Sequence, residues 1–77
     1  MTREEMEQLK VGDLLRYKLT HEELNFEVET IELVTEIRQT GIIVQTVTII
    51  TSSVPLYKVG GVGQLDRLNA PFFEKIA

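Results

Sequence analysis

The chain has 77 residues, 43% of them hydrophobic and 26% charged, with a formal net charge of -4 and no cysteine. This balance indicates one globular domain over residues 1–77, and it excludes a disordered chain, a disulfide framework and a thiolate metal site. The longest apolar stretch, Ile42 to Ile50, is far shorter than the roughly 20 residues that cross a bilayer. We therefore expect a soluble, cytoplasmic protein with no membrane partner.

The first residues predict a short helix. Thr2 and Glu5 form a Thr-x-x-Glu capping box, in which the hydroxyl accepts from the amide of residue 5 and the carboxylate reaches back. Met6 and Leu9 would share one face of a helix over Arg3–Lys10. Two turns are too few to hold alone in water, so we expect these two side chains to dock on the rest of the domain at one end.

We expect Gly12 to adopt the left-handed conformation and so to end the helix. Leu14–Leu19 reads as the first strand, and a polar loop, Thr20–Asn25, follows it. In the second strand the apolar residues fall on even numbers from Phe26 to Val28 and on odd numbers from Ile31 to Ile37. Because strand side chains alternate with period two, this phase switch predicts a bulge or bend near residues 29–31.

Residues 38–41 read as a hairpin turn in which Gly41 supplies a positive φ, and the β-branched run Ile42–Thr51 predicts a central strand covered on both faces. An edge strand follows over Leu56–Val59, after Pro55. The sequence Gly60-Gly61-Val62-Gly63 reads as a flexible connection, and Gln64–Asn69 as one helical or 3₁₀ turn. In a closing strand, Phe72–Ile76, alternation predicts Phe72 and Ile76 inside and Phe73 partly exposed.

Two phrases resemble the SH3-like small barrels: Lys10-Val11-Gly12-Asp13-Leu14, like the turn into the opening strand, and Gly63-Gln64-Leu65 with Asn69-Ala70-Pro71-Phe72-Phe73, like the short turn and final strand. The resemblance implies a mainly β fold, a small SH3-like barrel of about five strands with a short N-terminal helix. The chain has no tryptophan and only Tyr17 and Tyr57 as tyrosines, so the proline-peptide groove of SH3 domains is not implied.

No motif predicts a cofactor, a metal or a catalytic centre. The glycines of residues 60–63 match neither the dinucleotide fingerprint nor the Walker loop. His21 is the only histidine, and with Glu22 and Glu23 it lacks the further ligands that a metal site needs. Ser52 and Ser53 have no suitably spaced partner for nucleophilic catalysis. The cofactor expectation is therefore none, and we expect no enzyme.

The acidic charge lies in the first half, since residues 1–36 contain ten acidic and four basic residues. Glu27, Glu29, Glu32 and Glu36 would form one solvent-facing stripe, either a solvated face or, with an exposed Phe73, a surface that binds a partner.

These features favour a non-enzymatic protein-interaction module of the bacterial or phage cytoplasm, using its acidic face or a free strand edge. A nucleic-acid-associated small barrel is the alternative, although the bases Arg38, Lys58, Arg67 and Lys75 are few and dispersed for phosphate binding. A small enzyme is third. The partner's identity and the oligomeric state stay open.

Overall fold

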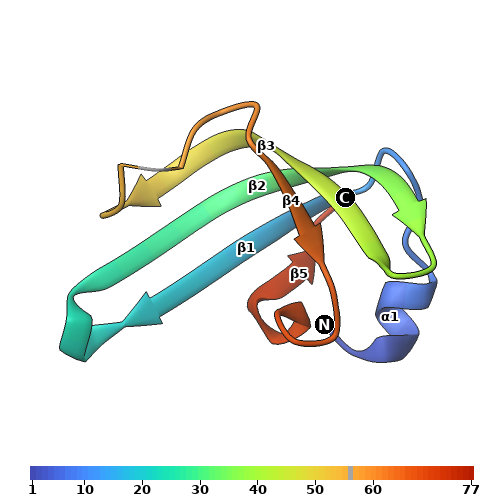
Figure 1. The fold of residues 1–77 in the computed structure, drawn as a ribbon, viewed down its shortest axis with the longest axis horizontal. Coiled ribbons are helices and arrows are strands. Elements are labelled where there is room, and N and C mark those ends of the chain that lie inside the picture. The colour runs from blue at the N-terminus through green and yellow to red at the C-terminus, as the bar shows by residue number, and fades with distance from the viewer. Residues whose placement is uncertain (56) are drawn as a thin grey trace.

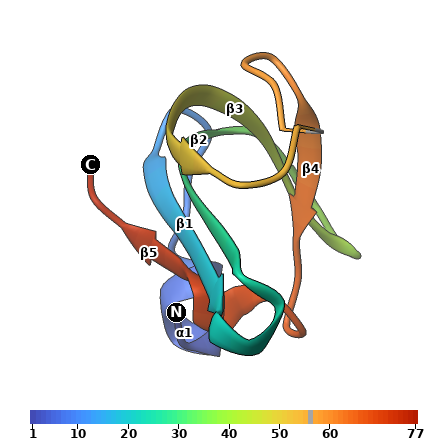
Figure 2. The same ribbon diagram turned by 90° about the vertical axis from the view of Figure 1, so that its left-hand side faces the viewer.

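The computed structural model describes residues 1–55 and 57–77, which form one antiparallel sheet of five strands in the order β4-β3-β2-β1-β5 (Figure 1). A mainly β fold with one short helix is therefore confirmed. β4 and β5 are the two edges of the sheet and lie on opposite sides of it (Figure 2), so the sheet is not closed into a barrel. In chain order the elements are α1 Arg3–Glu7, β1 Leu14–His21, the 3₁₀ helix η1 Glu22–Leu24, β2 Phe26–Arg38, β3 Gly41–Ser52, β4 Val62–Leu65, the 3₁₀ helix η2 Ala70–Phe72 and β5 Phe73–Lys75.

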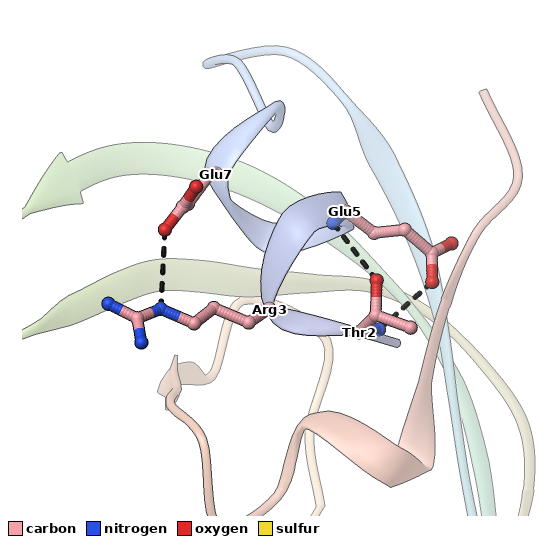
Figure 3. Close-up of polar contacts among 4 residues, drawn as sticks. All are labelled: Thr2, Arg3, Glu5 and Glu7. Carbon is pink, nitrogen blue, oxygen red and sulfur yellow. Dashed lines mark hydrogen bonds and ion pairs between the residues drawn. The ribbon is translucent and has the colours of Figure 1, made fainter.

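The predicted capping box begins α1 (Figure 3). The Glu5 amide donates to the Thr2 hydroxyl at 3.1 Å, and the Thr2 amide donates to the Glu5 carboxylate at 2.9 Å. The helix ends at Glu7, however, and not at Lys10. Gly12 has a φ of +100°, but it lies in the turn before β1 and does not cap the helix. The chain after α1 therefore turns directly into the sheet.

The phase of β2 differs from the prediction. Its buried residues keep one parity from Val28 to Val34, while Ile31 and Leu33 lie half-buried on the opposite, outer face. The switch occurs at Thr35, which has no register partner on β3. After it, Ile37 pairs with Ile42 and shares its side of the sheet. The expected bend near residues 29–31 is present as register shifts, but the extra residues lie on β3.

β3 is central in the sheet, as predicted, yet it is not covered on both faces. Its two extra residues, Val47 and Ile50, are 38% and 51% exposed. The hairpin before it has no positive φ at Gly41. That glycine leaves room for the Gln64 side chain, whose amide nitrogen donates to Thr40 O at 3.0 Å; a Cβ at residue 41 would come within 2.2 Å of this nitrogen and would displace it.

The apolar core lies where α1 meets the sheet. The predicted docking of the helix segment is confirmed, because Leu9 is buried and Met6 packs against the same cluster. Outside this cluster, Val28 is also buried farther along β2. The core cluster consists of Leu9, Leu15, Val34, Ile42, Val44, Leu65 and Phe73.

The edge strand expected at Leu56–Val59 is displaced along the chain. Leu56 lies outside the described residues, and residues 57–59 are not in a strand. An edge strand, β4, is instead formed by Val62–Leu65, which covers the end of the segment predicted as a flexible connection and the start of the predicted helical turn. The predicted helical turn is likewise shifted, since residues 67–69 form a turn and the 3₁₀ helix follows at Ala70–Phe72.

The orientation predicted for the closing strand is wrong. Phe73 is 6% exposed and packs against Tyr17 with ring centroids 4.9 Å apart, whereas Phe72 and Ile76 are each 40% exposed. The reason is local, because η2 includes Phe72 and the alternation of β5 begins only at Phe73. Phe73 is thus a core residue and not a surface contact.

We therefore predict that Phe73→Ala will be far more damaging than Phe72→Ala. Removing a buried phenylalanine costs about 3 to 5 kcal/mol, while a chain of this length has a total stability on the order of 4 to 12 kcal/mol. Urea unfolding monitored by circular dichroism compares the two variants. Both remove a phenylalanine ring, from neighbouring positions in the chain. Equal midpoints, or a lower midpoint for Phe72→Ala, would contradict the orientation of β5.

Candidate functional site

The four glutamates predicted as one acidic stripe do not share an environment. Glu27 and Glu36 are exposed, and Glu36 forms an ion pair with Arg38. Glu29 lies half-buried on the outer face, where its carboxylate is 3.4 Å from Arg16 Nε. Glu32 is buried on the inner face. The continuous stripe predicted from the sequence is therefore wrong, because Glu32 points to the other side of β2.

Glu32 lies among hydroxyl groups, with 6% of its surface exposed. The Thr46 hydroxyl on β3 donates to Glu32 Oε1 at 2.9 Å. Within residues 1–55 and 57–77, Glu32 Oε2 and the Thr30 hydroxyl have no hydrogen-bond partner. Burial raises the pKa of Glu32, and the hydroxyls of Thr30 and Thr46 oppose that shift. This carboxyl group therefore favours its neutral form more than an exposed glutamate does.

Tyr17 continues this polar row along the inner face, because it is the register partner of Thr30 on β2. Burial raises the pKa of Tyr17 to about 12, and the nearby Tyr57 hydroxyl and Glu32 carboxylate add to the shift. Tyr17, Thr30, Glu32 and Thr46 together form a polar patch on the inner face of the sheet.

An open groove lies over the core cluster at the α1 end of the molecule. Three segments far apart in the sequence form it: the helix segment 3–9, the β2–β3 hairpin with its flanks at 37–42, and the turn that follows β4 at 65–68. Leu9, Ile42 and Leu65 are its buried residues. Leu68 and Ile37, which are 80% and 48% exposed, extend this apolar surface to solvent.

Three of the chain's four arginines, Arg3, Arg38 and Arg67, line the same groove. Arg3 Nε lies 3.3 Å from a Glu7 carboxylate oxygen across one turn of α1 (Figure 3). Arg38 is held by Glu36 within the β2 end of the hairpin. We call this surface the arginine groove.

The turn that carries Arg67 and Leu68 is tightly held by hydrogen bonds. Asp66 Oδ1 accepts from the amides of Leu68 at 2.8 Å and Asn69 at 3.2 Å, and Asn69 Oδ1 accepts from the Asp66 amide at 2.9 Å. The Asn69 side chain also donates to Gln64 O at 2.8 Å. The exposed leucine is therefore presented on a backbone that is already ordered, which lowers the entropic cost of binding.

Sequence reasoning missed the arginine groove. It placed Arg38 and Arg67 in a dispersed basic half with Lys58 and Lys75, but the fold brings only the two arginines to the groove and adds Arg3 from the acidic half. Lys75 instead lies 3.6 Å from an Asp13 carboxylate oxygen. No local sequence pattern links the three segments. The spacing of the arginines along the chain therefore does not predict that they meet in the folded protein.

The other motifs have structural roles. His21 Nδ1 accepts from the Leu24 amide at 3.3 Å and so caps η1. Among the described residues there is no group of three or more histidine, aspartate or glutamate side chains that could hold a metal ion. Gly60, with a φ of +90°, forms the turn before β4, where its amide donates to Thr46 O at 2.7 Å.

Comparison of the chain with protein-family models, with curated proteins and with solved structures found no match. In the part of the chain that the structure describes, no helix is long and apolar enough to cross a membrane. The function is therefore argued from the geometry alone.

We predict that Glu32→Gln makes the protein more stable at pH 7 than the unaltered chain. The unfolded chain ionises Glu32 near pH 4.5, whereas the folded chain keeps the proton to higher pH. Glu32 thus contributes stability that is complete below pH 4.5 and lost as the pH rises through its folded pKa. Glutamine keeps the shape and the acceptor for Thr46 without that loss.

Urea unfolding of both proteins between pH 4 and pH 8 measures the difference, with Glu27→Gln as the matched control at an exposed carboxylate. We expect the advantage of Glu32→Gln to grow with pH and that of Glu27→Gln to stay near zero. A pH-independent difference for Glu32→Gln would show that the carboxyl group is not desolvated.

Proposed function

We propose that this protein is a non-enzymatic protein-interaction module that binds a segment of another protein chain in the arginine groove. The observation that carries the proposal is the composition of the groove. Its exposed apolar residues, Ile37 and Leu68, lie beside its buried apolar residues, and three arginines line the same groove. Protein interfaces combine an apolar centre with a polar rim, and arginine is enriched in them.

The charge pattern of the groove favours a protein partner over nucleic acid. Glu7 and Asp66 line the same groove as the three arginines, so the positive charge there is largely offset. Binding of a phosphate backbone depends on a concentrated basic surface. The protein as a whole has a net charge of -4, which adds long-range repulsion of nucleic acid.

We propose the SH3-like resemblance for the fold only. The strand order β5-β1-β2-β3-β4, with a 3₁₀ helix directly before the last strand, agrees with the element order that resembles SH3-like barrels. Such small β folds serve many functions, so the resemblance adds to the fold assignment and the groove carries the functional one.

We predict that Leu68→Glu abolishes selection of binding peptides without lowering thermal stability. The side chain is 80% exposed, so its loss leaves no cavity, while a carboxylate in the apolar strip would be desolvated by a bound partner. Panning a random peptide library against the unaltered chain, followed by calorimetric titration of enriched peptides, measures this.

Val59→Glu is the matched control, since Val59 is also exposed and does not line the arginine groove. It should bind the enriched peptides like the unaltered chain. If no peptide is enriched, or if the enriched peptides bind Leu68→Glu equally well, the groove is not the interaction surface.

The nucleic-acid alternative predicts a different outcome. If it were correct, labelled single-stranded and duplex oligonucleotides would bind, and the affinity would fall steeply between 50 and 200 mM salt. We expect no change in their fluorescence anisotropy at either salt concentration. Salt-sensitive binding that Arg67→Gln weakens would replace the protein-interaction proposal with this alternative.

A further inference from the structure

The β1–β2 hairpin ends in a second distinctive surface. Leu24, in η1, is 74% exposed, and the exposed residues Glu22, Glu23 and Glu27 lie close to it along the hairpin. In the part of the chain that the structure describes, none of these three carboxylates forms an ion pair. We call this surface, residues 22–24 with Glu27, the acidic tip.

The backbone of the acidic tip is ordered. Besides the bond from the Leu24 amide to His21 Nδ1, the Asn25 amide donates to Glu22 O at 3.1 Å. Asn25 itself adopts the left-handed conformation, with φ 52° and ψ 42°, and this reverses the chain into β2. An exposed leucine is thus held out from the body of the protein on a closed turn.

The acidic tip complements the arginine groove in both chemistry and shape. The tip presents one exposed apolar side chain with three carboxylates next to it along the chain. The groove presents an apolar strip lined by three arginines and two acidic residues, Glu7 and Asp66, and among the described residues Arg67 is the groove arginine without an ion pair. The tip is the end of a two-stranded hairpin, whereas the groove is an open hollow between three segments.

One copy of the chain cannot join its own two surfaces. The β1–β2 hairpin tip lies at one end of the long axis, and α1 with the β2–β3 hairpin lies at the other (Figure 1). The Cα atoms extend 33 Å along that axis. The strands between the two ends are continuous, so no loop allows the hairpin to fold back onto α1.

We infer that a second copy of this chain occupies the arginine groove, with its acidic tip placing Leu24 against Ile37 and Leu68. This inference rests on the proposed function, because it names the occupant of the same groove. The contact is heterologous, since it joins two different surfaces. Each contact leaves one tip and one groove unused, so the copies associate head to tail into longer assemblies.

Arg67 supplies the charge contact to the carboxylates of the acidic tip, because Arg3 and Arg38 are already paired with Glu7 and Glu36. Salt at physiological strength screens charges beyond about 8 Å, so most of the repulsion between two chains of net charge -4 is screened while the contact itself is not. The buried apolar area of one leucine against two side chains is small. The assembly should therefore be reversible and dependent on concentration.

Sedimentation equilibrium of the full chain tests the inference at concentrations on the order of 10 µM to 1 mM. The weight-average mass of the unaltered protein should rise with concentration. Leu24→Glu disrupts the acidic tip and Leu68→Glu disrupts the arginine groove, so each variant should remain monomeric. Val59→Glu adds the same charge away from both surfaces and should associate like the unaltered chain.

A mixture of the Leu24→Glu and Leu68→Glu variants gives the most specific test. Leu24→Glu still has a groove and Leu68→Glu still has a tip, so an equimolar mixture should form a dimer although neither variant associates alone. That dimer has no further matched pair of surfaces and should not grow.

A monomeric unaltered chain over the whole range, self-association of either variant, or a mixture that stays monomeric would overturn the inference. The peptide selection described above separates the two proposals. If the unaltered chain is monomeric but enriched peptides bind the groove, only the second copy as occupant is wrong. If no peptide is enriched either, the groove itself is not an interaction surface.

Discussion

The placement of one small apolar core at one end of a long sheet determines the rest of this structure. The core cluster collects Leu9, which follows α1, and side chains from all five strands, and Met6 of α1 packs against it. A domain of 77 residues has little apolar surface to spare, so a second core at the far end is not available. The β1–β2 hairpin therefore projects as an arm, and its tip carries charges in place of packing.

On β2 the usual placement of side chains is reversed, with polar residues on the inner face and apolar residues on the outer face. Thr30 and Glu32 point inward, while Ile31 and Leu33 point to the outer face. A buried carboxyl group with an unpaired oxygen is costly, and its neutral form reduces that cost. β2 keeps its pairing with both neighbouring strands through this reversal, since backbone hydrogen bonds do not depend on side-chain polarity.

Local chemistry made part of the fold predictable. The Thr2–Glu5 capping box and the position of the hairpin turn before Gly41 depend on residues close in sequence, and both were found, although Gly41 lacks the predicted positive φ. The facing of β2 and β5 was not predictable, because it depends on where bulges and a 3₁₀ turn reset the alternation. The bulges appear only in the pairing of β2 with β3, and the strand alternation rule does not include the 3₁₀ turn that contains Phe72. The rule that apolar residues point inward then failed at Ile31, Leu33 and Phe72.

The candidate site was still less accessible to sequence reasoning. Arg3, Arg38 and Arg67 come from three segments that meet only in the folded chain. The sequence did show that acidic charge is concentrated in the first half. The structure divides that charge between the β1–β2 hairpin, with Glu22, Glu23 and Glu27, and α1, with Glu4, Glu5 and Glu7.

A concentration series of ¹H–¹⁵N correlation spectra tests this account most directly, because it reports on every backbone amide of the unaltered chain at once. The account predicts that on concentrating the sample the amide shifts move together at residues 22–25 and at residues 37–40 and 66–68. Amides of the outer sheet face between the two ends, such as those of Arg16 and Thr48, should stay in place. Shifts confined to that outer face, or to only one end of the molecule, would contradict it.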